Sequence, residues 1–532
     1  MRSFKFTVQV IFYSLILALL VSRSMSAVIS HDENQFIAAG QFLADHGLLP
    51  YVNYPYTHMP YGIVFYALAA GLTSYDYLAG RLLSSVVWLL CFLVIIALAR
   101  TVRGRPASPL SDLPPFPELL LEFALVLVLV YHPVAAYVLT AALNNSFATL
   151  FSLLALLFFI RASRPASFSY RDPLYSGIAV SLASWTRFNY ASLVIVLFIL
   201  WLLPSLLFRA SQPLKTICRY ILGVAIAALP ALALLVAAPS HFYYGNLVYI
   251  RLNTIYYEGL LYRSGMDLIP KFRGFLLGVS QRPIDWLLYG VLVALSVLSV
   301  IRLIRRRSLS DLGMFATAGF SFVLWLTAYA PSPALTQYFF APIPFLLVLV
   351  AWAIFELARF VPRPYLLVLP VLLIAILTSA QPQNPITELA RLSQPSSWTP
   401  IEVHDFAWTL RQYVPPGAVL TLLPMVPLEA GYDAYPFTAT GPFSWRTSLL
   451  LTAQRRAQYG VTSPNELPQL LAVTPPVAIL TGFEAPNAGF ERQDLGGLET
   501  PLVDYALQHG YRRMQLTPSF LEHPLILWVR PQ

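Results

Sequence analysis

Long apolar segments constrain this chain more than any other feature of its sequence. About 18 or more apolar residues in a row can cross the hydrocarbon core of a bilayer as a helix. Because lipid offers the backbone no hydrogen-bond partner, such a stretch has to close its own hydrogen bonds, as a helix does. The sequence therefore predicts an all-α polytopic membrane domain with about 11 transmembrane helices. The candidate segments lie near residues 6–22, 78–99, 119–140, 144–160, 173–187, 189–208, 217–238, 284–301, 312–330, 337–357 and 364–380.

The composition supports a membrane protein and excludes several other classes. Hydrophobic residues make up 57% of the 532 positions and charged residues 11%, whereas soluble proteins carry roughly 25% charged residues. The two cysteines, Cys91 and Cys218, fall in or beside apolar runs, so neither a disulfide framework nor a zinc site is indicated. GxGxxG, P-loop and HExxH patterns are absent from the sequence, so no common nucleotide-binding or metalloprotease signature is present.

Charge is distributed unevenly along the chain. Residues 381–532 hold 9 Arg, no Lys and 12 acidic residues, which leaves 25 basic and 13 acidic residues before them. The basic connectors are RTVRGRPASPLSDLPP, RASRPASFSYRD, FRASQPLK, RLIRRRSLSD and RFVPRP. Because basic loops stay in the cytoplasm, we expect a multi-pass protein of the cell membrane with a cytoplasmic N-terminus and an extracytoplasmic C-terminal domain. This pattern explains the basic excess without nucleic-acid binding.

The first apolar segment has a second interpretation. A basic start, an apolar stretch and the residues SMSA also describe a secretory signal peptide. Cleavage would leave the following loop outside the cell in either case, so the topology does not decide between the two. The segment is interpreted as a retained helix.

The rest of the chain divides into a membrane part, 1–380, and a soluble part, 381–532. Two long outer loops interrupt the membrane part at about 28–77 and 239–283, and both contain amphipathic stretches suited to the membrane interface. After residue 381, short apolar runs (GAVLTLL, PVAIL, YRRMQL and LILWV) alternate with helical patterns. This alternation predicts a small extracytoplasmic α/β domain.

An acidic pair, Asp32 and Glu33, follows the first apolar segment in HDENQFIAAG. Charge beside hydrocarbon usually has a task, although an aspartate before an amphipathic run also makes a good helix cap. Eight basic residues fall outside the cytoplasmic loops: Arg23, Arg81, Arg187, Arg251, Arg263, Lys271, Arg273 and Arg282. Carboxylates and cations at headgroup depth suit sugar transfer from a polyprenyl phosphate. A carboxylate would take the acceptor's proton, and the cations would stabilise the leaving phosphate.

Four motifs also occur in a characteristic order. HDENQFIAAGQFLADHGLLPYVNYPYTHMPYGIVFYALAAG is followed by YLAGRLLSS, LASWTRFNY and QYFFAPIPFLL. In these motifs and their order, over about residues 5–380, the chain resembles the GT-C superfamily of membrane glycosyltransferases. More narrowly, it resembles bacterial relatives of protein O-mannosyltransferases and the lipid A aminoarabinose transferase, which are glycosyltransferase family 39-like. The resemblance implies a polyprenyl-phosphate-linked sugar as donor and a protein, lipid or glycan as acceptor.

The resemblance also implies roles by position. Asp32 matches the acidic residue taken as catalytic base, and Glu33 completes the acidic pair. His58 stands where relatives often have a basic residue before Pro-Pro, although only Pro60 is present here, and Asn53 stands where Asp is frequent. The residues expected to bind the donor phosphate are His58, Arg81, Arg187, Arg251, Lys271 and Arg273. The residues expected to contact substrate are Tyr54, Tyr61, His241 and Tyr338.

Alternatives stay open at this level. A transporter or flippase for a lipid-linked sugar would need ionisable residues or broken helices near the middle of the bilayer, whereas the charges here lie at the ends of segments. An O-antigen-type polymerase would carry its main outer loop late, and a non-catalytic GT-C relative would share every motif. Arg81 would also serve by snorkelling, and the tyrosines as an interfacial belt. The sequence identifies no particular cofactor. A carboxylate pair near a histidine is compatible with a divalent metal ion, although no ligand spacing demands one.

Overall fold

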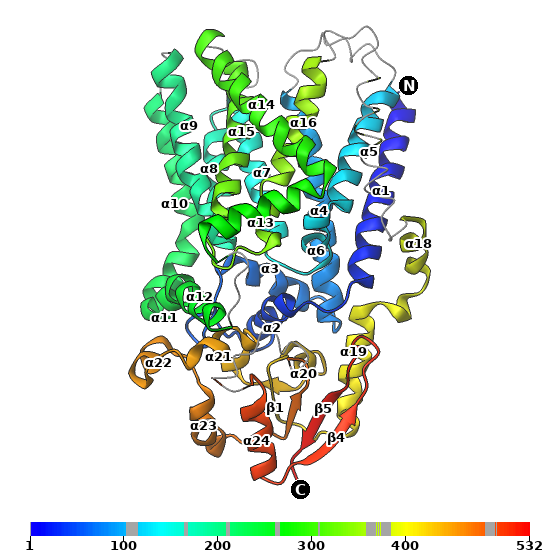
Figure 1. Cartoon of the computed structure of the whole chain (residues 1–532), viewed down its shortest axis with the longest axis vertical. Helices are drawn as coiled ribbons and strands as arrows, with labels where there is room; N and C mark the ends of the chain where they lie inside the picture. The colour runs from blue at the N-terminus through cyan, green and yellow to red at the C-terminus, as the bar shows by residue number, and fades with distance from the viewer. Residues whose placement is uncertain are drawn as a thin grey trace.

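The structure is a computed structural model of the chain. Figure 1 shows a long helical bundle with a small sheet-containing domain at one end. The residues it describes are 2–102, 115–163, 169–208, 213–260, 266–306, 309–357, 385–484 and 497–531, with the single residues 366, 369, 371, 373 and 495.

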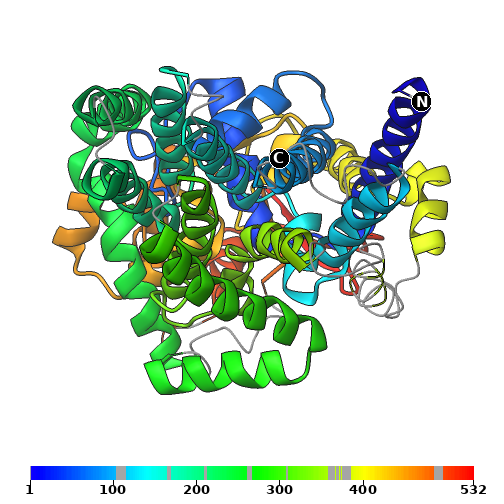
Figure 2. The ribbon, with the colours of Figure 1, turned by 90° about the horizontal axis from the view of Figure 1, so that it is seen from above.

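The helices of the bundle run along the long axis of the molecule and pack side by side when viewed from above (Figures 1 and 2). Their sequences are apolar on most sides, as expected for helices surrounded by lipid and by one another. They are α1 (Arg2–Ser26), α4 (Asp76–Val102), α5 (Pro115–Tyr131), α7 (Asn145–Ala162), α8 (Asp172–Thr186), α9 (Ser192–Phe208), α10 (Pro213–Ala237), α14 (Pro283–Arg306), α15 (Leu309–Thr327) and α16 (Ile343–Leu357). The short helix α6 (Pro133–Thr140) lies at a steep angle to α5.

The predicted count of eleven spans is not confirmed. Within the described residues, 6 helices are long and apolar enough to cross a membrane, or up to 7 if a bent pair is counted as one span. The segments at 173–187, 189–208 and 312–330 form helices of fewer than 20 residues, α8, α9 and α15. The segment at 364–380 lies almost wholly outside the described residues.

The segment predicted to span at 119–140 does not form one straight helix. It is broken into α5 and α6, whose axes differ by 81°. The break lies at His132, which has an extended backbone (φ −64°, ψ 125°) and precedes Pro133 at the first position of α6. Proline disfavours a helical conformation in the residue before it and supplies no N–H to continue the preceding helix. The dipeptide His-Pro is thus the sequence signal for the break.

Helices α8 and α10 cross at two glycines. A Cβ atom on Gly177 would lie 2.2 Å from the carbonyl oxygen of Tyr220, and one on Gly223 would lie 2.2 Å from that of Leu174. Small residues of this kind allow the close backbone approach that holds helices together in lipid, where apolar burial drives no association.

Short helices cover the end of the bundle that faces the sheet domain (Figure 1). They come from the two loops predicted to lie at the outer surface. The first loop forms α2 (His31–His46) and α3 (Tyr61–Ala70), and the second forms α11 (Pro239–Tyr243), the π-helical turn η3 (Tyr244–Val248), α12 (Tyr249–Gly259) and α13 (Leu268–Ser280).

The C-terminal domain contains the predicted α/β arrangement. Its 5-stranded sheet has the order β2-β1-β3-β5-β4, in which β2, β1 and β3 are parallel and β5 is antiparallel to both neighbours. The four apolar runs each form a strand, and the short β2 was not predicted. The strands are β1 (Ala418–Thr421), β2 (Asp433–Ala434), β3 (Ala478–Thr481), β4 (Arg512–Leu516) and β5 (Leu525–Val529). The helices are α18 (Pro385–Ala390), α19 (Thr399–Thr409), α20 (Met425–Glu429), α21 (Pro442–Ser448), α22 (Ala453–Tyr459), α23 (Leu467–Val473) and α24 (Thr500–Gln508).

Buried hydrogen bonds join this domain to the bundle. The Asn34 side chain in α2 donates to the carbonyl oxygen of Leu422 (3.1 Å) and accepts from the backbone N–H of Met425 (3.1 Å). Glu429 accepts from the backbone N–H of Tyr77 (3.1 Å) and pairs with His404 (2.8 Å). Since these groups are buried, separating the domains would leave them unpaired. These hydrogen bonds therefore hold the C-terminal domain against the bundle at α2 and at the start of α4.

The N-terminus lies at the end of the bundle opposite the C-terminal domain (Figure 1). With the native cysteines replaced, we expect a membrane-impermeant thiol reagent to label Ser397→Cys, at an exposed site of the C-terminal domain, in intact cells. The same reagent should label Ser310→Cys, in the basic connector RLIRRRSLSD, only after the cells are opened, because basic loops stay in the cytoplasm. Labelling of Ser310→Cys from outside intact cells would refute the topology.

Candidate functional site

Asp32 lies half-buried in the first turn of α2, the helix that is hydrogen-bonded to the C-terminal domain through Asn34. Its Oδ2 atom accepts from the Tyr137 hydroxyl on α6 (2.8 Å) and from the Gln337 amide (3.4 Å). The residue that caps α2 is Ser30, and Glu33 completes the capping box. The side chain of Asp32 is therefore not used as the helix cap, contrary to the simpler interpretation of the acidic pair. Its Oδ1 atom has no hydrogen-bond partner among the described residues.

Glu33 is fully buried and forms a paired ion bridge with Arg81 of α4. Arg81 donates from Nε to Oε1 (2.9 Å) and from Nη2 to Oε2 (2.8 Å). The carboxylate also accepts from the Tyr77 hydroxyl (2.9 Å) and from the backbone N–H groups of Ser30 (2.9 Å) and Ala142 (2.6 Å). These contacts fill its acceptor capacity. They fix the start of α2 against α4 and against the α6–α7 connection.

The other N–H groups of Arg81 are also occupied. Nη1 donates to the carbonyl oxygens of Ser24 (2.6 Å) and Ala27 (2.8 Å), and Nη2 donates to that of Val28 (3.0 Å). A guanidinium has five N–H donors, and all five are used here. We expected Arg81 to bind the phosphate of the sugar donor. In this structure, however, Arg81 has no N–H group left to donate to a phosphate. Its geometry is that of a residue that positions Asp32 through Glu33.

Arg187 brings a positive charge into the region of Asp32. It ends α8 in an extended conformation, and its Nη1 donates to the side-chain oxygens of Asn144 (2.9 Å) and Asn145. Its guanidinium carbon lies 6.0 Å from the ring centroid of Tyr338, near the limit for a cation–π contact. It makes no ion pair with a carboxylate in the part of the chain that the structure describes. Its remaining N–H groups are thus available to an anion.

His58 lies within electrostatic reach of both charges. Burial and, to a smaller extent, the charge of Arg187 lower the pKa of its imidazole to about 4, while Asp32 opposes the shift. The ring packs against Phe36, with centroids 5.1 Å apart. At neutral pH the imidazole is therefore uncharged, so it would offer a phosphate a hydrogen bond and no positive charge.

The other predicted residues lie apart from Asp32. Arg251 and Arg273 are exposed on α12 and α13. The Tyr61 hydroxyl donates to the Ala227 carbonyl on α10, and His241 contacts the Tyr51 carbonyl (2.6 Å). Tyr54 is buried with its hydroxyl unpaired among the described residues. Among the four residues expected to contact substrate, Tyr338 lies near a charged group of this site, because its ring faces the guanidinium of Arg187.

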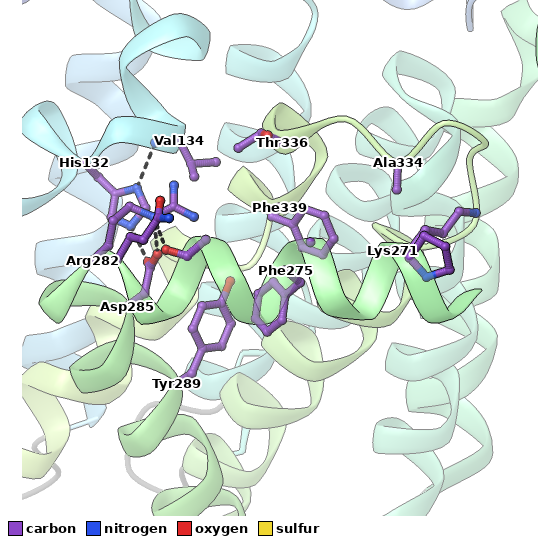
Figure 3. Close-up of a pocket in the computed structure, with 14 residues that line it drawn as sticks. His132, Val134, Lys271, Phe275, Arg282, Asp285, Tyr289, Ala334, Thr336 and Phe339 are labelled. Atoms are coloured by element: carbon purple, nitrogen blue, oxygen red, sulfur yellow. Dashed lines mark hydrogen bonds and ion pairs between the residues drawn. The ribbon is translucent and has the colours of Figure 1, made fainter. Parts of the chain in front are cut away.

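A cavity of about 290 Å³ lies between α13, α14, the α5–α6 break and the 3-10 turn η4 (Thr336–Phe340). Figure 3 shows His132, Arg282 and Asp285 at one end, Lys271 at the other, and Phe275 and Phe339 between them. His132 accepts from Val134 N–H through Nδ1 (3.2 Å). Its Nε2 therefore carries the proton and donates to Asp285 (2.7 Å). Arg282 pairs with the other oxygen of Asp285 (2.8 Å).

Lys271 is largely buried at its end of this cavity. Its Nζ donates to the Tyr329 carbonyl (2.7 Å) and to the Ser332 hydroxyl (2.8 Å). Burial lowers its pKa, and Asp267 opposes the shift. An ammonium group has three donors, so one donor is left after these two contacts. Lys271 is thus the predicted phosphate ligand that lines a cavity.

The turn η4 joins the cavity to the region of Asp32. Thr336 and Phe339 line the cavity, whereas Gln337 donates to Asp32 and Tyr338 lies near Arg187. Four consecutive residues thus border one place or the other. A ligand in the cavity would lie one turn of backbone away from the carboxylate.

The residues that could hold a metal ion are few. No group of three or more His, Cys, Asp and Glu side chains is suitably arranged in the part of the chain that the structure describes. Asp32 has one open oxygen, and the Glu33 carboxylate is filled by protein donors. The arrangement consists of a carboxylate with one open oxygen and of separate cations.

Sequence reasoning missed several residues of this site. Tyr137 and Gln337 lie about a hundred and three hundred positions from Asp32 and were taken as parts of spans. Asn144 and Asn145 were placed at a helix boundary without a role. Adjacent asparagines in an apolar region, and a polar residue beside QYFF, are signals that would have drawn attention to them.

Comparisons with known proteins identify the fold. ArnT from Cupriavidus metallidurans, solved bound to undecaprenyl phosphate, has a similar structure, with a TM-score of 0.56, 12% sequence identity, and 99% of this chain and 100% of that chain covered. The Archaeoglobus fulgidus oligosaccharyltransferase, solved with a tethered acceptor peptide, gives a TM-score of 0.51 at 13% identity and covers 97% of this chain and 74% of that one. The likeness shows that this chain has the same overall fold as these two membrane proteins. No family model matches the chain, and no curated protein matches it.

Proposed function

We propose that this protein is a glycosyltransferase that moves a sugar from a polyprenyl-phosphate donor to an acceptor on the extracytoplasmic face of the membrane. The observation that carries the proposal is Asp32, a half-buried carboxylate with one open oxygen at the start of α2. It lies between a lipid-facing bundle and a soluble domain, where a lipid donor and an outer acceptor would meet. The transferred group would be a hexosyl or a pentosyl unit.

In the proposed reaction, Asp32 is the general base. An acceptor hydroxyl loses its proton to Oδ1 of Asp32, and its oxygen forms a bond to the anomeric carbon. The bond between that carbon and the phosphate oxygen breaks, and polyprenyl phosphate leaves with the electron pair. Arg187 stabilises the negative charge of the leaving phosphate. Tyr137 and Gln337 hold the carboxylate in place by donating to its Oδ2 atom.

The cavity beside η4 supports a lipid-borne donor. Its walls combine apolar rings, Phe275 and Phe339, with the cations Lys271 and Arg282. This combination suits an amphiphile whose phosphate lies next to its apolar chain. ArnT is solved with undecaprenyl phosphate, and an archaeal oligosaccharyltransferase of similar fold is solved with a dolichol-phosphate. We propose that this chain binds a lipid of the same chemical kind.

A transporter for a lipid-linked sugar is the alternative of another class. It would move the lipid and leave the sugar–phosphate bond intact. Asp32 has an open carboxylate oxygen, and Arg187 keeps N–H groups that make no ion pair among the described residues. Such a pair of groups is suited to breaking that bond. The geometry therefore favours transfer over transport.

The proposal is tested with purified full-length protein in lipid nanodiscs. Synthetic undecaprenyl-phosphate pentoses and hexoses are supplied together with a bacterial envelope extract as acceptor. We expect one donor to be consumed, with release of undecaprenyl phosphate and a labelled product that forms only when extract is present. Movement of the intact donor across a liposome membrane, with no donor consumed under any condition, would support the transporter instead.

A further inference from the structure

Helix α21 of the C-terminal domain lies next to α12 at the junction between this domain and the bundle (Figure 1). Arg446 in α21 contacts α12. Its Nη2 donates to the side-chain oxygen of Asn253 (2.6 Å) and to the Tyr249 hydroxyl (3.4 Å). Aromatic rings surround the guanidinium, with centroid distances of 4.8 Å to Phe443 and 5.4 Å to both Tyr256 and Tyr257. All of these partners are electrically neutral.

The charge of Arg446 has no carboxylate partner among the residues that the structure describes. The residue is 8% exposed, and its Nε atom is buried without a hydrogen-bond partner. In the part of the chain that the structure describes, it forms no ion pair with a carboxylate. Arginine stays protonated in proteins, and a buried charge is normally paired because its desolvation is costly. Aromatic rings offset part of this cost and leave the guanidinium able to accept an anion.

Arg456 of the neighbouring helix α22 shows the usual arrangement. It is 9% exposed, close to the value for Arg446. It donates to Glu466 (2.7 Å) and to the Leu451 carbonyl (2.7 Å). The same domain thus contains one buried arginine with an acidic partner and one without.

Arg446 lies near the proposed catalytic base. The Phe443 ring that contacts its guanidinium also meets the ring of His31 edge-on, at 4.9 Å between centroids. His31 immediately precedes Asp32. Burial raises the pKa of the Tyr249 hydroxyl to about 12, with Arg446 lowering it and Asp32 raising it. Tyr249 therefore interacts electrostatically with both Arg446 and Asp32.

We propose that Arg446 binds an anionic group, a phosphate or a carboxylate, of the acceptor substrate. The proposal rests on the function proposed above. The donor's phosphate arrives from the membrane, where Arg187 ends a helix of the bundle. Arg446 belongs instead to the outer domain, from which the acceptor approaches. Its guanidinium fork fits the planar or tetrahedral oxygens of such a group.

The test uses inorganic phosphate as the probe for the shared anion chemistry. Purified full-length protein is unfolded thermally in sodium phosphate and in sodium chloride of equal ionic strength, and a phosphate dissociation constant is obtained from the shift. We expect phosphate to stabilise the native protein. Arg446→Gln should raise the dissociation constant about tenfold or more, as expected for the loss of a charge-assisted hydrogen bond.

Two control variants identify the site of the effect. Arg456→Gln should lower the melting temperature, because Glu466 loses its partner, while keeping the response to phosphate. Arg187→Gln should also keep a phosphate response. If phosphate does not stabilise the native protein, or if Arg446→Gln responds as the native protein does, Arg446 is only a contact between domains and the proposal is wrong.

A second measurement distinguishes a role of Arg446 in binding the acceptor from a role in binding the sugar donor. Binding of undecaprenyl phosphate is measured against undecaprenol, which lacks the phosphate. We expect Arg446→Gln to preserve the preference for undecaprenyl phosphate, and Arg187→Gln to reduce it. Loss of this preference in Arg446→Gln would assign the residue to the donor and overturn the acceptor role. Neither measurement requires sugar transfer, so failure of the proposed function would be seen separately in the donor-consumption assay.

Discussion

Arg81→Met is expected to destabilise the folded protein by about 3–5 kcal/mol, the usual cost of leaving one member of a buried ion pair without its partner. The Glu33 carboxylate would remain in a fully buried site without its two hydrogen bonds from arginine. Three backbone carbonyls of residues 24–28 would lose their donor as well. The measurement is the free energy of unfolding in mixed micelles, where a reversible transition is available.

A double-mutant cycle identifies the cause of this loss. Glu33→Gln and Arg81→Met should each be strongly destabilising, and the double variant should lose less than the sum, because no unpaired charge is left. Asp433→Asn is the matched control, since its contact with His46 is long (3.8 Å) and 68% of the Asp433 side chain is exposed. An exposed pair contributes about 0–1 kcal/mol.

The cycle also tests the role that the sequence suggested for Arg81. A folded Arg81→Met protein with native stability that had lost its affinity for undecaprenyl phosphate would restore Arg81 as a phosphate ligand. The structure predicts instead that Arg81→Met lowers the stability of the folded protein, and that any change in lipid binding follows from this loss. Every N–H of Arg81 already has a protein acceptor.

The fold class could be predicted from the sequence because the thickness of a bilayer sets the length of an apolar segment that crosses it. Segments such as those in α4 and α10 are apolar over more than a membrane thickness, and no soluble fold would account for them. The count of spans was harder to predict. A 15-residue helix such as α8 is long enough to pack in a bundle and too short to pass a length criterion.

The site was predicted at its most local feature and missed where it depends on packing. Asp32 was identified because it follows directly on an apolar segment. Its partners Tyr137 and Gln337 come from distant segments, and no pattern in one sequence shows that these segments meet. The neighbouring Glu33 was expected to share the chemistry, but burial against Arg81 turns it into a structural group. Adjacent residues on a helix point in different directions, which a sequence motif does not distinguish.

The helix-cap interpretation of Asp32 is weakened by the structure. Ser30 occupies the cap position, and its hydroxyl already accepts from the backbone N–H of Asp32 (3.2 Å). An aspartate in the first turn still gains from the helix dipole, by roughly 0.3–1 kcal/mol. That gain does not explain two side-chain donors converging on one oxygen while the other oxygen stays open. This arrangement supports the proposal that Asp32 is the general base.

Asp32→Asn is accordingly expected to reduce sugar transfer by about 10²–10⁴-fold, the range typical of general-base catalysis. The amide keeps the size of the side chain and an oxygen for Tyr137, so folding and binding of undecaprenyl phosphate should change little. The measurement is single-turnover transfer at saturating donor. Tyr137→Phe removes one positioning hydrogen bond and leaves the base in place, so it should cost far less than Asp32→Asn. Near-native turnover in Asp32→Asn, with undecaprenyl phosphate still bound, would show that the proton leaves by another route and that the open oxygen of Asp32 is not the base.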